Sequence, residues 1–218
     1  MPALAQLLNS RHSPYVPDPQ IQPFSPGIWV WQNYDPEIKT DLWSSAVQAE
    51  SGVYLVDPIP LNSDQIIELS ASRPIAGVIV TNGNHERAAV EISDRFSVPI
   101  FAYPSAFSRS RPARFSAATE DPKIGGDLEV IAIEGAAPGE IALYQSANGG
   151  TLIVGDALIN FDPYGFALLP KKYCENQKRM RSSIRQLLNK PADRMLFAHG
   201  MPILSSATAR LRELLESQ

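Results

Sequence analysis

The stretch VIVTNGNHERAA, residues 78–89, is the part of the sequence from which the fold can be inferred. Its apolar start, Val78 to Val80, predicts a buried strand, and we expect a helix to begin near His85. In open α/β sheets, functional side chains gather where a strand ends, because loop residues and backbone donors converge there. Between strand and helix the loop offers the polar side chains of Asn82, Asn84, His85, Glu86 and Arg87. We therefore expect the functional site in this loop.

The composition predicts one globular domain without disulfides or membrane-spanning segments. Of its 218 residues, 44% are hydrophobic and 19% are charged, which is enough to bury a large core. The net charge of −4 gives no general attraction to nucleic acid or to anionic membranes. Cys174 is the only cysteine, so no intrachain disulfide can form. Neither a secretory signal pattern nor a run of membrane-spanning length is present, and we expect a cytoplasmic protein without a membrane partner.

Prolines separate an N-terminal arm, residues 1–26, from one domain, residues 27–218. Residues 1–12 could form a short helix, and the five prolines that follow predict an extended segment lying on the body of the domain. The arm's prolines are Pro14, Pro17, Pro19, Pro23 and Pro26.

Within the domain, strands come first and then alternate with helices. Short runs rich in Val, Trp and Tyr predict three consecutive antiparallel strands at 27–34, 41–49 and 52–60. Ser63 is a plausible cap for the helix that follows, which carries Ile66, Ile67 and Leu69. The remaining predictions are strands at 75–81, 99–103, 128–134, 141–146, 151–156 and 195–198, helices up to Phe96 and at 173–189 and 205–216, and an irregular segment at 104–127. Asn148-Gly149 marks a hairpin, because both residues tolerate positive φ.

Two half-sheets with helices after their internal strands predict an α/β fold built as a four-layer αββα sandwich. The turns occur in a characteristic order: Thr81 and its loop, then Ala137-Pro138-Gly139, then Gly155-Asp156, and finally His199-Gly200. From residue 27 to the C-terminus, this order resembles the metallo-β-lactamase fold superfamily.

The resemblance implies where metal ligands would stand. In that superfamily, histidines of a Thr-His-x-His-x-Asp-His loop and of a Gly-His-Thr-Pro-Gly turn bind the first metal ion. Here Asn82, Asn84 and Ala136 occupy those positions, so the first site is lost. At the second site, Asp156 and His199 are retained, but other residues replace the aspartate and the last histidine. Glu86 replaces the aspartate and Arg87 replaces the histidine. His85 lies one residue from a ligand position, and a rearrangement of the loop could bring its side chain into the site.

Zinc chemistry makes these replacements decisive. Even an open catalytic zinc site has three protein ligands, and asparagine amides are poor ones. A guanidinium keeps its charge and repels a divalent cation. We therefore expect no metal and an ion pair between Arg87 and Asp156, with Glu86 as a further partner, closing a degenerate site. The alternative is one zinc or similar divalent ion held by Asp156, His199 and either Glu86 or His85.

Structural roles compete with these site roles. Asn84 could cap the helix, and His85 shares a helical stripe with Ile92 and Phe96, which favours a hydrogen-bonded core histidine. Asp156 could stabilise a turn, and the role of His199 stays open. Asp57 resembles the aspartate that supports metal ligands in the superfamily, but the usual glycine is missing, so a turn residue is the default reading.

Two basic clusters suggest phosphate contacts, although a solvated helix face and a surface loop are favoured over a nucleic-acid interface. Their members are Lys171, Lys172, Lys178, Arg179, Arg181 and Arg185 in one, and Arg109, Arg111 and Arg114 in the other. Cys174 is expected to be a packed thiol rather than a nucleophile.

Three function classes remain, and whether the chain is an enzyme stays open among them. First stands a degenerate, metal-free member of the superfamily with a binding, scaffolding or unknown role, whose partner would be an unknown small molecule or protein. Second is a one-metal hydrolase of esters, thioesters or amides. Third is a nucleic-acid-associated protein. The sequence identifies no substrate, and it leaves the oligomeric state open.

Overall fold

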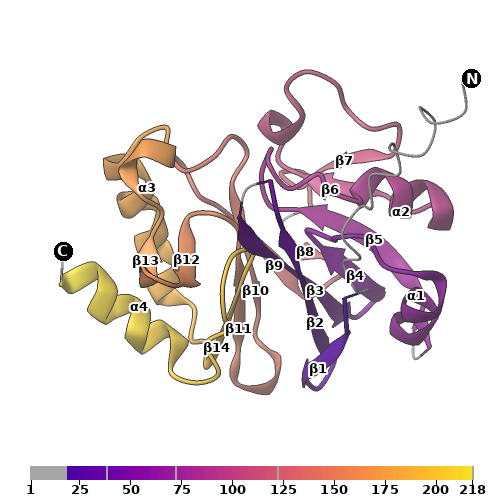
Figure 1. The fold of residues 1–218 in the computed structure, drawn as a ribbon, viewed down its shortest axis with the longest axis horizontal. Coiled ribbons are helices and arrows are strands. Elements are labelled where there is room, and N and C mark those ends of the chain that lie inside the picture. Colours follow the sequence, from indigo (N-terminus) through magenta and orange to yellow (C-terminus); the bar gives the residue numbers. More distant parts are fainter. Residues whose placement is uncertain (1–18, 38, 72, 122, 218) are drawn as a thin grey trace, which may run out of the picture.

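The protein is a sandwich of two β-sheets with helices on both outer faces (Figure 1). The computed structural model describes residues 19–217 except 38, 72 and 122. Helices α1 (Ser63–Ser70) and α2 (Ala89–Phe96) lie on one side, and α3 (Gln177–Ile184) and α4 (Ala207–Glu216) lie on the other. This arrangement confirms the predicted αββα fold.

The first sheet has seven strands, in the order β1 to β7. Its strands are β1 (Gln22–Ser25), β2 (Ile28–Asp35), β3 (Thr40–Ala49), β4 (Gly52–Val56), β5 (Ile75–Val80), β6 (Ile100–Ala102) and β7 (Phe115–Ala117). The first four pair antiparallel, as the sequence predicted for residues 27–60, and the last four pair parallel. Parallel pairing requires crossovers, which α1 provides between β4 and β5 and α2 between β5 and β6.

The second sheet has five strands in the order β14-β11-β10-β9-β8. They are β8 (Lys123–Ile124), β9 (Leu128–Ala132), β10 (Ile141–Gln145), β11 (Thr151–Val154) and β14 (Arg194–Phe197). Strands β10 and β11 form the predicted hairpin, in which Asn148 and Gly149 adopt φ of 54° and 89°. A separate pair, β12 (Leu158–Phe161) and β13 (Gly165–Leu168), was not predicted.

The core consists of three apolar layers that follow from the amphipathic pattern of each element. One lies beneath α1 and α2 and includes Trp31 and Ile92, and another beneath α3 and α4 includes Met180. Between the sheets lies the third, which includes Ile79 and Leu143. The sheets are thus fixed face to face, and the loops at their carboxyl ends meet at one edge.

Local differences from the sequence-based expectations have simple causes. Helix α1 is capped by Asn62 rather than Ser63, because Asn62 and Gln65 form a capping box, and Ile67 is 63% exposed. The predicted helix 173–189 is broken into η3 (Lys171–Tyr173), α3 and η4 (Arg185–Asn189), with Tyr173 60% exposed. Segment 104–127 is less irregular than expected, since it contains η1 (Pro104–Phe107), β7 and β8. The β10–β11 hairpin turn is η2 (Ala147–Gly149).

The end of the predicted N-terminal arm belongs to the first sheet. Strand β1 pairs with β2, and Gln65 Nε2 donates a hydrogen bond to the carbonyl of Pro19. Residues 1–18, including the expected short helix at 1–12, lie outside the described residues. No helix within residues 19–217 is long and apolar enough to cross a membrane.

Candidate metal centre

Four chain segments meet at the edge where the carboxyl ends of the strands converge. Asp57 follows β4, the loop 81–88 follows β5, Asp156 follows β11 and His199 follows β14. The two sheets thus each contribute two segments, and residues up to 142 positions apart become neighbours. This places Asp156 and His199, both predicted from the sequence, in one group with His85.

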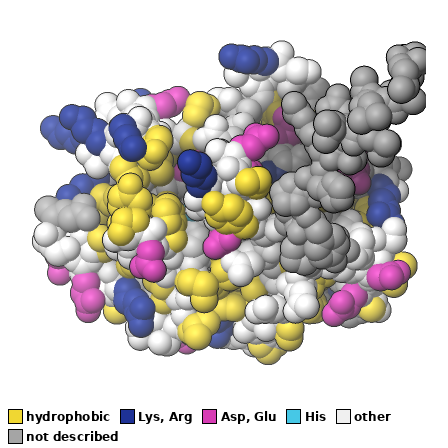
Figure 2. Space-filling model, viewed as in Figure 1, with side chains coloured by type: hydrophobic (Ala, Val, Ile, Leu, Met, Phe, Trp, Pro, Cys, Tyr) yellow, Lys and Arg dark blue, Asp and Glu magenta, His cyan; other side chains and the backbone are white. Residues whose placement is uncertain are grey.

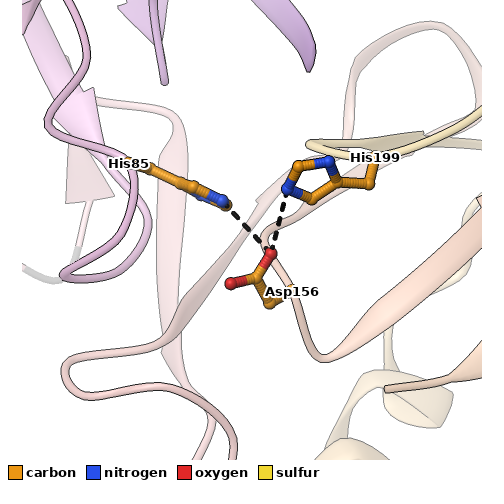
Figure 3. Close-up of side chains that lie close together, drawn as sticks. All are labelled: His85, Asp156 and His199. Carbon is orange, nitrogen blue, oxygen red and sulfur yellow. Dashed lines mark ion pairs between the residues drawn. The ribbon is translucent and has the colours of Figure 1, made fainter. Parts of the chain in front are cut away.

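Asp156 lies between two imidazoles (Figure 3). Its Oδ1 is 3.2 Å from Nε2 of His85 and 3.4 Å from Nε2 of His199. His85 is 2% exposed and Asp156 is 8% exposed, while the side chain of His199 is 16% exposed. The group is therefore largely shielded from water, and His199 is the member nearest to solvent.

Asp57 orients His85 from the opposite side of the ring. His85 Nδ1 lies 3.0 Å from Asp57 Oδ2, and Thr81 donates to both carboxylate oxygens, from its amide at 2.8 Å and from its hydroxyl at 2.5 Å. A carboxylate at Nδ1 favours the tautomer with the proton there and turns Nε2 toward Asp156. The turn role expected for Asp57 is thus only part of its function, because it also positions a site residue.

The two carboxylates control the protonation of His85. Burial disfavours the imidazolium, but Asp57 and Asp156 outweigh it and raise the pKa of His85 to about 9. For Asp156, burial favours the neutral acid, but His85 and His199 outweigh it and hold the pKa well below its usual range. In the absence of a metal ion, the group therefore carries an imidazolium between two carboxylates at neutral pH.

Two asparagines hold the second oxygen of Asp156. Nδ2 of Asn82 and Nδ2 of Asn84 each donate to Asp156 Oδ2 at 3.2 Å. The side chain of Asn82 also accepts a hydrogen bond from the amide of Asn84 at 2.8 Å. Asn84 does not cap α2, which begins at Ala89 without a side-chain cap, so that prediction was wrong. The loop continues to Ala88 because the side chain of Asn82 accepts a hydrogen bond from the loop's own backbone, in place of a helical hydrogen bond.

Glu140 belongs to this network and was missed by the sequence reasoning. Its Oε2 accepts from Asn82 Nδ2 at 2.7 Å, and its Oε1 accepts from the amide of Ala157 at 2.9 Å. Burial, with Asp156 nearby, raises the pKa of Glu140 to about 8. The available signal was a glutamate directly before Ile141–Gln145, a strand in which every residue is buried. A charged residue at such a place requires partners.

Arg87 does not form the predicted ion pair with Asp156. Its Nη1 donates to the carbonyls of Trp43 and Asp57 at 2.7 and 2.8 Å, and its Nη2 lies 3.5 Å from the carbonyl of Ala198. Among the described residues, the ion-pair partners of Asp156 are His85 and His199. Arg87 has a positive φ of 39° and lies in a turn, where the sequence predicted the start of a helix.

Two further residues predicted to line the pocket, Glu86 and Ala136, do not belong to the group of His85, Asp156 and His199. Glu86 is exposed and is not part of the His85, Asp156 and His199 group. Ala136 is fully buried in the apolar layer that also contains Met180, where it offers no ligand atom. Cys174 is partly buried, with its Sγ 3.3 Å from the carbonyl of Leu169, as expected for a packed thiol.

His85, Asp156 and His199 fit a single metal ion. Their ligand atoms all lie within 4.8 Å of one another. Bonds of about 2.1 Å at tetrahedral angles separate neighbouring ligand atoms by about 3.4 Å, close to the observed 3.2 and 3.4 Å. His85 Nε2 is buried and makes no hydrogen bond of normal geometry to any described group. Asp57 supplies the outer carboxylate that supports metal-binding histidines. Of the two candidates for a third ligand, His85 belongs to this group and Glu86 does not.

Several members of the basic clusters are engaged within the protein. Arg114 pairs with Asp94 at 2.6 Å, Arg179 pairs with Glu134 at 2.8 Å, and Arg181 donates to the carbonyl of Leu215. Figure 2 shows Lys and Arg side chains at the end of the molecule that carries α3, beside apolar side chains. These three arginines therefore have partners within the protein.

Comparisons with known proteins agree with the fold and the family resemblance. The sequence profile of the metallo-beta-lactamase superfamily matches residues 23–218. A metallo-beta-lactamase from Pontibacter korlensis superposes with a TM-score of 0.70 at 17% identity, covering 92% of this chain and all of that one. A beta-lactamase domain protein from Burkholderia ambifaria gives 0.67 at 18% identity, covering 91% and 76% of the two chains. A variant flavo di-iron protein from Thermotoga maritima gives 0.60 at 13%, covering 93% and 61%. No curated protein matches the chain significantly.

Proposed function

Because the chain belongs to the metallo-beta-lactamase superfamily, we propose that His85, Asp156 and His199 hold one divalent ion, zinc or a similar metal, and that the protein is a one-metal hydrolase. The observation that carries the proposal is the entry of His85 into the site. It supplies the third ligand that the sequence motif lacks, and three protein ligands leave a zinc ion open to water or substrate.

The bound ion would lower the pKa of a water molecule for attack on an ester, thioester or amide carbonyl. The chain's own residues prepare the site for it. Asp57 keeps the proton of His85 on Nδ1, so that Nε2 is free to bind. Asn82 and Asn84 hold Oδ2 of Asp156, which leaves Oδ1 facing the two imidazoles.

A second candidate is a metal-free protein that binds a small molecule or another protein. The observation in its favour is the charge balance of the buried group. With a pKa of about 9, His85 is an imidazolium between Asp57 and Asp156 and compensates these carboxylates without a metal ion. In this case the site would have a structural role only.

Metal analysis of protein produced with added zinc separates the two candidates. We expect about one zinc per chain in the natural protein, and a strong loss in His85→Asn and His199→Asn. Glu86→Gln is the matched control and should keep its zinc, since Glu86 is exposed and outside the group. Zinc-free natural protein, or full occupancy in His85→Asn, would contradict the one-metal site.

The hydrolase is tested separately on a panel of simple ester, thioester and amide substrates. Zinc-loaded protein should hydrolyse at least one class, and Asp156→Asn should reduce the rate at least about 100-fold because it weakens the ion's binding. A zinc-loaded protein without activity on the whole panel would retain the metal site but refute the hydrolase.

A further inference from the structure

The guanidinium of Arg87 lies where the two sheets meet beside the site. The carbonyls of Trp43 and Asp57 accept hydrogen bonds from its Nη1 at 2.7 and 2.8 Å, and the carbonyl of Ala198 lies 3.5 Å from its Nη2. Hydrogen bonds from a charged donor are stronger than neutral ones. Two carbonyls thus bind the guanidinium closely, and that of Ala198 makes a longer contact.

The three carbonyls belong to both sheets. Trp43 lies in β3 and Asp57 follows β4, whereas Ala198 follows β14 of the second sheet. The amide of Trp43 also donates to the carbonyl of Ala198 at 3.0 Å. Arg87 thus joins the sheets at the residue directly before His199.

The backbone of Arg87 is adapted to this contact. Its φ of 39° lies in the left-handed region, which residues other than glycine rarely occupy. The amide of the next residue, Ala88, donates to the carbonyl of Pro58 at 3.0 Å and fixes the turn. A strained turn that places a partly buried charge among backbone carbonyls points to a role at this site.

We propose that Arg87 is a positioning residue that sets the place of His199 opposite Asp156. Within the described part of the chain, its hydrogen bonds go to backbone carbonyls rather than to either of these side chains. Together with the Trp43 amide, it holds the Ala198 carbonyl beside β3 and beside the residue after β4, and His199 is the next residue of the chain. Loss of Arg87 should let the segment after β14 move away from the first sheet and separate the two histidines.

Histidine NMR provides a direct test, because the chain has only three histidines. Metal-free protein with labelled histidine is compared at one pH as the natural chain, Arg87→Met and Arg87→Lys. Arg87→Met should shift the imidazole resonances of His199, and zinc affinity should fall about 10- to 100-fold, as for other outer groups that orient metal ligands. Arg87→Lys keeps the charge but cannot span three carbonyls, so it should show smaller changes of the same kind. Arg109→Met, at an exposed position, is the matched control.

A merely structural arginine would give a different result. Arg87→Met would then unfold at a lower temperature, while the His199 resonances and zinc affinity of the folded protein stayed unchanged, and the proposal would be overturned. Should Arg87→Met not fold, natural resonances in Arg87→Lys overturn it equally. The NMR comparison needs no metal, so absence of zinc binding counts against the proposed function alone.

Discussion

His85 Nδ1 lies 3.0 Å from Asp57 Oδ2, while Nε2 of the same ring lies 3.2 Å from Asp156 Oδ1. Both ring nitrogens thus face carboxylates in a site that excludes most water. A neutral imidazole cannot donate to both at once. The group therefore requires either a proton or a metal ion on Nε2, and this requirement links its behaviour to pH.

The metal-free protein should lose stability as the pH rises from neutral to alkaline. The folded state raises the pKa of His85 from 6.5 to about 9, so it binds more protons than the unfolded chain between these values. The stabilisation is complete below pH 6.5 and is lost as the pH rises through about 9; a shift of this size corresponds to about 3 kcal/mol. Urea denaturation at pH 6 and pH 9.5 measures it. His85→Asn should show a flatter profile, and an equally steep profile in that variant would contradict the assignment.

Glu140→Gln should lower the stability of the protein at low pH, and it should make that stability depend less on pH. Burial raises the pKa of Glu140 from 4.5 to about 8, so the neutral acid stabilises the fold below pH 4.5 and this contribution is lost as the pH rises through about 8. Glutamine removes that titration. It keeps an acceptor for Ala157 but turns an amide toward Asn82, which costs about 1–3 kcal/mol. Denaturation midpoints at pH 5 and pH 8 should therefore lie closer together in the variant than in the natural chain.

Gly155→Ala should disrupt the network without removing any of its members. A Cβ atom there would lie 2.6 Å from Thr81 Oγ1 and 2.7 Å from Glu140 Oε1. Such overpacking of a buried polar group typically costs about 1–3 kcal/mol. Gly165→Asn is the control, because nothing lies within 4 Å of a Cβ at Gly165 and asparagine tolerates its φ of 62°. Equal thermal stability of the two variants would argue against a close-packed network at Gly155.

Zinc affinity should rise with pH. His85 must release its Nε2 proton before it can bind the ion, so apparent affinity should increase about tenfold per pH unit below pH 9. Titration against a competing chelator at pH 6.5 and 8.5 should give an affinity difference of about 100-fold. A pH-independent affinity would mean that His85 is not a ligand.

The fold could be predicted because it depends on the order of strands and turns. The Asn148-Gly149 hairpin and the buried strand before Thr81 have strong local signals, and the structure confirms both. The turns that carry Asp156 and His199 could be located for the same reason, since each residue lies two positions after the end of a strand.

The composition of the site was harder to predict, because it depends on where α2 begins. The sequence favoured a start near His85, but α2 begins at Ala89, and the loop before it is held by hydrogen bonds of Asn82 and Asn84. Because the helix begins four residues later than predicted, His85 lies in the loop and its side chain enters the site, instead of packing on the apolar face of the helix. Glu140 was missed because its partners, Asn82 and Ala157, are distant in sequence.

The hydrogen bond between the Trp43 amide and the Ala198 carbonyl spans 155 positions of the chain. Closing a loop of this length costs conformational entropy, which only the docking of both sheets offsets. His85 meets Asp156 and His199 only once both sheets have docked at this edge. Assembly of the site therefore reports completion of the whole domain, and a ligand bound there selects the fully folded chain over every partly folded one.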